Sequence, residues 1–233
     1  MLSTTRAIVL RTVKHSDSAV VAHVYTEQFG RRSCMVRAGG KNRARQAALL
    51  PLSRVELVVS EVGDGGLLSA REIRIDRPYL QLHTDPLRGA IALFVQEVFY
   101  RTLRADAPDP ELFAFVEHAL EEVDTTASLA LLPQRVLIGL AHQLGFLPAS
   151  PQAPFSGFDL REGAFFPGPA MHEQCMEPEE TKALVALLED SAPPSVSASV
   201  RRSLLERLLL FFRLHVEGFG EPRSVAVLHH VLH

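Results

Sequence analysis

The chain has 233 residues, of which 47% are hydrophobic and 22% charged, a composition typical of a folded globular protein. Its apolar runs are far shorter than the roughly 20 residues that span a bilayer, and we expect no signal peptide at its N-terminus. Two cysteines, Cys34 and Cys175, give no disulfide framework, so we expect reduced thiols and a cytoplasmic protein.

The net charge of −3 is unevenly distributed along the chain. Residues 1–77 contain thirteen Lys and Arg against seven Asp and Glu, which gives +6, whereas residues 78–233 carry −9. Charge asymmetry of this kind is informative about binding partners rather than about fold. It indicates that the first third of the chain contacts an anionic partner.

The first third of the chain predicts a small β-barrel. β-prone runs alternate with turn signals, and an Ala- and Leu-rich segment at 43–50, which ends at Pro51, predicts a short helix. The predicted strands span 6–11, 19–26, 31–37, 54–62 and 67–75. Five strands with a helix between the third and fourth are typical of an OB-fold, although SH3-like barrels share the strand count. The predicted fold class is therefore α+β, with an OB-fold domain at 1–77 and an all-helical domain at 78–233.

Residues 28–55 contain seven cations and not one Asp or Glu. A glycine pair at 39–40 lies among these cations and would let the backbone approach a partner closely. Cations spaced along a loop suit the repeating charges of a nucleic-acid backbone. The predicted DNA-binding residues are Arg31, Arg32, Arg37, Lys41, Arg43 and Arg45. The alternative is that these cations form an ordinary solvated surface.

Residues 1–77 contain only two aromatic residues, Tyr25 and Phe29. Single-strand-binding OB-folds commonly stack bases on several aromatic rings. Phosphate contacts should therefore dominate any nucleic-acid binding here, with little reading of base sequence and a steep dependence on salt.

Beyond residue 77 the apolar residues recur at helical spacing. Asp85-Pro86 and Asp109-Pro110 each predict an N-cap followed by a helix, and Thr125 or Thr126 is predicted to open a third helix that Gly145 ends. Further helices are predicted at about 178–190, 195–217 and 222–232. Between them, residues 146–177 are rich in Pro, Gly and Phe, which indicates either an ordered insertion held by its aromatic residues or a mobile loop.

No catalytic motif is found. Gly39-Gly40-Lys41 lacks the spacing and the hydroxyl residue of a P-loop, and there is no His-Glu-x-x-His sequence. Adjacent acidic pairs such as Glu121-Glu122 point to different faces of a helix and make poor acid/base partners. The sequence therefore predicts a protein that is not an enzyme and needs no cofactor.

Several short segments together resemble the RecO family of DNA repair proteins, which are bacterial recombination mediators. The resemblance covers nearly the whole chain. The segments that carry it are 6–11, 25–30, 37–41, 144–148, 158–163, 214–215 and 224–228. It implies an OB-fold and a helical domain that bind single- and double-stranded DNA, anneal complementary strands and, with RecR, load RecA onto strands coated by single-strand-binding protein (SSB).

The resemblance also implies an apolar groove in the helical domain for the acidic, Phe-ended C-terminal tail of SSB. Candidate residues for a wall of this groove are Leu204, Leu208, Phe211 and Phe212, and the alternative is that they are core residues. Many family members carry four zinc-ligating cysteines in the insertion, whereas this insertion has only Cys175 with His172 nearby. Structural zinc normally takes four ligands, so we expect no metal here.

A second hypothesis from another class remains open. The chain could be a protein-interaction adaptor whose basic barrel binds acidic protein surfaces, with DNA contact incidental. DNA binding at low and moderate salt distinguishes the two hypotheses.

Overall fold

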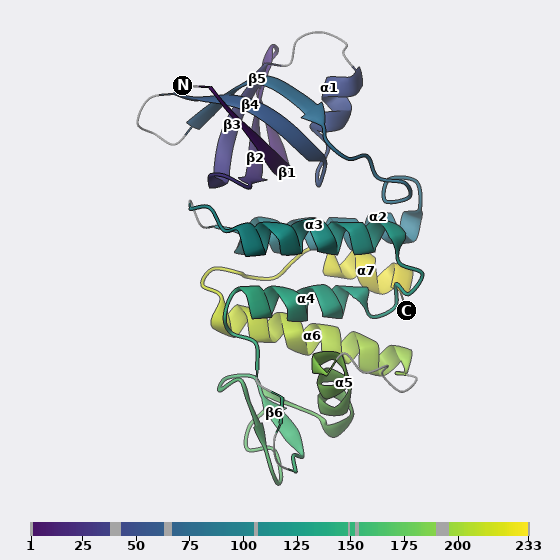
Figure 1. Ribbon diagram of the computed structural model, residues 1–233. Helices are drawn as coiled ribbons and strands as arrows, with labels where there is room; N and C mark the ends of the chain where they lie inside the picture. The colour runs from purple at the N-terminus through teal and green to yellow at the C-terminus, as the bar shows by residue number, and fades with distance from the viewer. Residues whose placement is uncertain are drawn as a thin grey trace. The chain divides into compact units, whose positions relative to one another are not determined.

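A computed structural model describes residues 2–37, 43–62, 67–104, 107–148, 150–151, 154–189 and 196–232 (Figure 1). The elements are β1 (Ser3–Ser16), β2 (Ala19–Thr26), β3 (Gly30–Arg37), α1 (Arg43–Ala48), β4 (Arg54–Val62), β5 (Leu67–Ile75), α2 (Pro86–Thr102), α3 (Pro110–Thr125), α4 (Leu132–Gln143), β6 (Gly157–Asp159), β7 (Ala164–Phe166), β8 (Cys175–Met176), α5 (Pro178–Leu188), α6 (Ala198–His215) and α7 (Val225–Leu232). The chain divides into two compact units, 1–125 and 126–233, which we describe separately.

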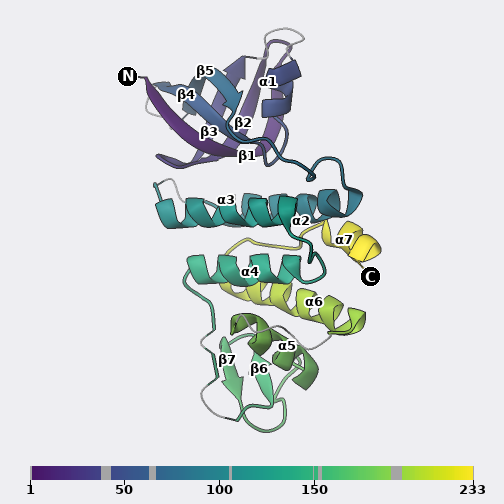
Figure 2. The same ribbon diagram turned by 45° about the vertical axis from the view of Figure 1, so that its right-hand side comes forward.

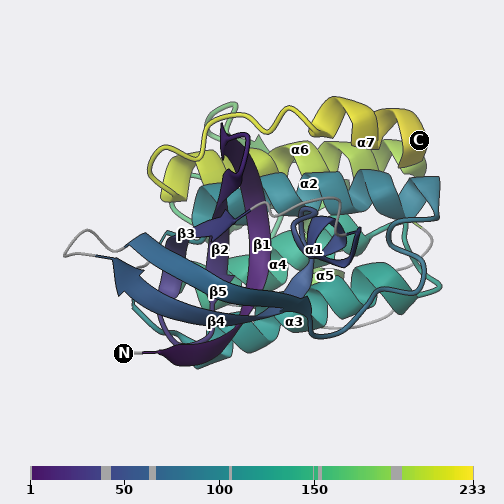
Figure 3. The ribbon, with the colours of Figure 1, turned by 90° about the horizontal axis from the view of Figure 1, so that it is seen from above.

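The first unit contains a closed five-stranded barrel with strand order β1-β2-β3-β5-β4, which confirms the predicted OB-type layout. The β3–β5 pair is parallel and the other pairs are antiparallel. Figure 3 looks down onto these strands, with α1 beside them. The barrel interior is filled by small and branched apolar side chains: Ala7, Val9, Ala22, Val24, Cys34, Val36, Ala48, Val55, Leu57, Val59 and Leu68. Alternate residues of each strand therefore point outward.

Helices α2 and α3 belong to the barrel unit by packing, and they lie side by side against one part of the barrel (Figures 1 and 2). Asp85 caps α2 as predicted, since its carboxylate accepts from the backbone N–H groups of Leu87 and Arg88. The carboxylate of Asp109 accepts from Leu112 N at 3.0 Å in the same way. The predicted domain boundary at residues 77 and 78 stays a prediction. The two compact units divide at residues 125 and 126 instead, so α2 and α3 fall in the same unit as the barrel.

The second unit contains α4 to α7 and a three-stranded sheet of order β7-β6-β8. Figure 2 shows β6 and β7 beside α5. The prediction that α4 begins at Thr125 or Thr126 is wrong, because the helix begins at Leu132. Pro133 stands in its first turn, where a residue without an N–H is tolerated, and it marks the start of the helix. Gly145, with φ of +79°, follows the end of α4 as expected.

The described residues of the insertion contact α6 through aromatic rings. Phe158 on β6 lies 5.7 Å from the ring of Phe211 on α6, in an edge-on arrangement. Phe146 lies 5.0 Å from Phe212 and stacks on His215. Aromatic pairs of this geometry each contribute about 0.5–1.5 kcal/mol beyond the area they bury. The described residues of the insertion thus make the aromatic contacts that the first of the two predicted alternatives requires, and the choice between the alternatives stays a prediction.

Two charged residues link the end of the barrel to α3. Arg54 is only 2% exposed. It forms an ion pair with Glu121 and lies over the ring of Tyr79. Asp124 is 1% exposed, and its carboxylate accepts from the backbone N–H groups of Leu80, Gln81 and Leu82 at 2.7–2.8 Å. Burial alone would raise the pKa of Asp124, but these three hydrogen bonds and the charge of Arg54 lower it.

Asp124→Ala should lower the free energy of unfolding by about 2–4 kcal/mol, because three buried N–H groups lose their acceptor. A carboxyl group with a lowered pKa stabilises the fold above its unfolded pKa and loses that contribution as pH falls through the folded pKa. Wild type should therefore lose more stability than the variant between about pH 5 and pH 3. Urea unfolding at a series of pH values measures both effects, and parallel pH profiles would contradict this role for Asp124.

Candidate nucleic-acid interface

Most cations that lie near α3 are neutralised by carboxylates. Arg6 pairs with Glu27 at 2.6 Å and with Glu117 of α3 at 2.8 Å. The hydrogen bond from Arg6, opposed by partial burial, lowers the pKa of Glu27. Arg54, the last cation of the acid-free stretch 28–55, pairs with Glu121 of α3. These arginines stabilise the fold and are not available to an external anion.

The exposed outer face of β1, β2 and β3 has a different charge environment. Arg11 pairs in register with His23, which pairs with Ser33, so these residues form one row across the face. Arg37 ends β3 in a second row, and Arg71 follows directly after Ala70, the register partner of Val36. Among the described residues, none places a carboxylate within ion-pair distance of Arg11, Arg37 or Arg71.

We define the outer face by three rows of residues. The first row is Arg11, His23 and Ser33, the second is Val13, Val21 and Met35, and the third is Ala19 and Arg37. Arg71 follows Ala70 on the neighbouring strand β5, at an irregularity of the β4–β5 register. Arg11, Arg37 and Arg71 are exposed. Side chains of the intervening residues, such as Ala22, Cys34 and Val36, point into the barrel and are buried.

Arg31 has a structural role at one border of the outer face. Its guanidinium donates to the backbone carbonyls of Tyr100 at 2.9 Å and Leu103 at 3.2 Å, at the C-terminal end of α2. It also lies 4.5 Å from the centre of the Tyr100 ring, and Arg11 lies 5.7 Å from the same ring. Cations near helix C-termini and over aromatic rings are stabilising. Partial burial and the charges of Arg31 and Arg11 lower the pKa of His23.

The structure distributes the six predicted DNA-binding residues unequally. Arg37 and Arg43 are exposed, and Lys41 lies outside the described residues. Arg32 donates to the carbonyl of Arg31, and Arg45 to the carbonyl of Arg37, each at 2.9 Å. Arg31 and Arg37 thus lie at opposite ends of β3, and Arg43 and Arg45 are on α1.

Arg11, His23 and Arg71 were missed because they lie outside the acid-free stretch. Only the strand register brings Arg11 and His23 to the same face as Arg37, and only the β3–β5 pairing brings Arg71 to the strand beside it. The sequence did place Arg11 in a strand, since it is the last residue of the first predicted strand, 6–11. The pairing partner of that strand, however, is a long-range property that a local pattern does not give.

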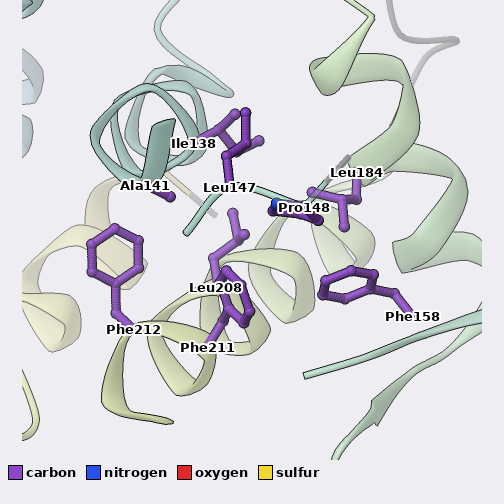
Figure 4. A pocket seen from close by; sticks show the side chains of 9 residues that line it. All are labelled: Ile138, Ala141, Leu147, Pro148, Phe158, Leu184, Leu208, Phe211 and Phe212. Atoms are coloured by element: carbon purple, nitrogen blue, oxygen red, sulfur yellow. The ribbon is translucent and has the colours of Figure 1, made fainter. Parts of the chain in front are cut away.

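The predicted groove residues of α6 are buried. Leu208, Phe211 and Phe212 line an apolar pocket with Ile138, Ala141, Leu147, Pro148, Phe158 and Leu184, as Figure 4 shows. Leu204 is fully buried and does not line it. The pocket has a volume of about 10 Å³, enough for roughly one water molecule. Both alternatives for these residues, a wall of a groove and a part of the core, stay predictions.

The insertion brings three donor groups together. His172 Nε2 lies 3.1 Å from Asp159 Oδ2, and His172 Nδ1 lies 3.6 Å from Cys175 Sγ and accepts from Gln174 N. The carboxylate of Asp159 and the thiol of Cys175 thus lie at different nitrogens of the His172 ring. A metal ion bound to Nδ1 would have only His172 and Cys175 as ligands, because Asp159 bonds to Nε2. Two such ligands do not make the four of a structural zinc site, and this donor set does not fit one.

No helix within the described part of the chain combines the length and the hydrophobicity needed to cross a membrane.

Arg31→Ala should lower the free energy of unfolding by about 1–2 kcal/mol, because two carbonyls at the end of α2 lose a charged donor. Arg37→Ala is the matched control on the same strand and should change it by less than about 0.5 kcal/mol, as is usual for an exposed side chain. Chemical unfolding of both variants measures the difference. Equal losses of stability would contradict the distinct roles of the two arginines.

Purified protein should contain well under one equivalent of zinc, and a chelator should leave its melting temperature unchanged, because the described donor set is incomplete. Elemental analysis together with thermal melts tests this. One stoichiometric equivalent of zinc, lost with a drop in melting temperature, would contradict it.

Comparisons with known proteins agree over nearly the whole chain. Residues 1–79 match the family described as "Recombination protein O N terminal", and residues 83–224 match "Recombination protein O C terminal". A protein of Christiangramia forsetii named "DNA repair protein RecO" is 26% identical over 238 residues, which cover 99% of each chain. A protein of the same name from Flavobacterium johnsoniae is 27% identical, and the match covers 96% of each chain. Another from Bacteroides fragilis is 28% identical, and the match covers 98% of each chain.

Proposed function

Because the chain belongs to the recombination protein O family, we propose that it acts in DNA repair and recombination as a non-enzymatic DNA-binding mediator. In this role it anneals complementary strands and, together with RecR, helps to load RecA onto single strands coated by SSB. Such a function places the protein in the cytoplasm, where the DNA is.

One observation supports DNA binding most directly. Arg11 and Arg37 share the outer face of the barrel, Arg71 lies on the neighbouring strand β5, and no described carboxylate pairs with any of the three. Arg6 and Arg54 on other parts of the barrel are paired with glutamates. The face formed by strands 2 and 3 is also the one that OB-folds use to bind oligonucleotides. Arg43, exposed at the start of α1, and Lys41 complete the proposed set of phosphate contacts.

We place Arg31, Arg32 and Arg45 at the border of this set. Arg31 is held by carbonyls and by the Tyr100 ring, so its charge adds to the local potential without the side chain reaching out. Arg32 and Arg45 each spend one guanidinium nitrogen on a backbone carbonyl. Their positive charges add to the potential at this border.

For the SSB tail we propose the apolar pocket between α4 and α6. Its lining residues carry no charge, and its present volume does not admit a phenyl ring, so the segment with Leu147 and Pro148 would have to move on binding. Arg207 on α6 is the basic residue that we propose for the acidic part of the tail, and it pairs with Glu180 at 3.3 Å. A fluorescent acidic peptide that ends in Phe tests this partner, and an absence of binding removes it from the proposal.

DNA binding should weaken steeply with salt. Contacts to roughly four to six phosphates predict that a plot of log K against log salt concentration has a slope of about −3 to −5. Replacing Arg37, Lys41 and Arg43 together with Ala should reduce that slope by about 2–3 and weaken binding to the same extent for all sequences. Fluorescence anisotropy with labelled oligonucleotides at several salt concentrations measures both quantities.

Arg74→Ala is the control for that experiment, because Arg74 is exposed but already pairs with Glu56. It should change neither the affinity nor the slope. If wild type binds acidic proteins yet binds no oligonucleotide even at low salt, the adaptor hypothesis replaces the proposed function.

A further inference from the structure

An apolar row separates the two cationic rows of the outer face. Val13 pairs in register with Val21, and Val21 pairs with Met35, so the three side chains lie in line across β1, β2 and β3. Val13 is 42% exposed, and Val21 and Met35 are half-buried. With neighbouring strands just under 5 Å apart, the row is roughly 10 Å long.

The cationic rows lie two residues away along each strand, on either side of this apolar row. Two residues of extended chain span roughly 6.7 Å. Arg11 and Arg37 therefore border the apolar row from opposite sides, while the ring of Tyr100 closes the border next to Arg11. An anionic partner that follows the cations must present something to the apolar row between them.

A DNA duplex presents phosphates on its outside and hides the faces of its bases by stacking them. It would cover the apolar row with its charged backbone and gain nothing from it. A single strand presents phosphates together with the flat, apolar faces of its bases. Such faces can lie on any apolar surface, and the contact tolerates every base because every base has a π-face. Met35 suits this contact, since a thioether interacts favourably with aromatic rings.

We propose that Val13, Val21 and Met35 form a base-contact strip that makes the barrel prefer single-stranded over double-stranded DNA. This inference rests on the proposed DNA-binding function and specifies how that site chooses its substrate. The phosphates run over Arg11 on one side and Arg37 with Arg71 on the other. The strip substitutes for the aromatic platform that residues 1–77 lack.

The experiment compares a single strand with the same strand built from abasic nucleotides, which keep the phosphates but carry no bases. Wild type should bind the normal strand about fivefold more tightly, at the low end of what base stacking on a platform provides. A strip variant, Val13→Thr with Val21→Thr and Met35→Gln, keeps side-chain size but replaces much of the apolar surface with polar groups. For this variant the ratio should fall to about one.

Two controls separate the contributions. Val58→Thr with Ile75→Thr makes the same kind of change on β4 and β5, outside the strip, and should keep the wild-type ratio. Arg37→Ala should weaken binding of the normal and the abasic strand by the same factor. Circular dichroism and thermal melts confirm that each variant folds.

Equal affinity of wild type for the normal and the abasic strand would overturn the base-contact strip while leaving DNA binding intact. An unchanged ratio of the two affinities in the folded strip variant would do the same. If wild type binds neither strand, the proposed function itself fails. A strip variant that does not fold is replaced by Val13→Thr alone, at the most exposed of the three positions. This variant should lower the ratio in part, and an unchanged ratio would count against the strip.

Discussion

The charge pattern of the barrel unit depends on ion pairing with the helices that pack against it. Glu117 and Glu121 of α3 neutralise Arg6 and Arg54, and this anchors the barrel to α3. Asp124 in the next turn of α3 holds the chain that follows β5 through three backbone hydrogen bonds. Two carboxylates of α3 thus neutralise cations where α3 packs against the barrel. Arg11 and Arg37 on its outer face, with Arg71 on β5, can attract an external anion. Because the paired and the unpaired cations lie on different parts of the barrel, it can be both anchored to α3 and basic.

The fold was predictable from local signals to a large extent. Four of the five strands were placed within one residue, because turn signals such as Gly30 bound β-prone runs. Asp-Pro pairs located the starts of α2 and α3, since an N-cap followed by proline is a strong helix signal. The start of α4 was misplaced because Thr125 and Thr126 also look like caps, whereas Pro133 sets the actual first turn.

The candidate site was only partly predictable. The acid-free stretch indicated a basic surface but could not distinguish Arg37, which is exposed, from Arg54, which is buried beside Glu121. That distinction depends on a contact between residues 67 positions apart. Arg11 and the strip of Val13, Val21 and Met35 likewise depend on the register of β1, β2 and β3. A local pattern gives the alternation of a strand, but the neighbours of that strand are set by the folded barrel.

Hydrogen exchange of the backbone amides with and without a single-stranded oligonucleotide tests the central claim most directly, because it maps the bound face without any mutation. The account predicts slower exchange in β2, β3 and the second half of β1, with β4 unchanged. Slower exchange confined to the helices of residues 126–232, or an unchanged pattern at saturating oligonucleotide, would contradict the claim that the outer face of the barrel binds the DNA.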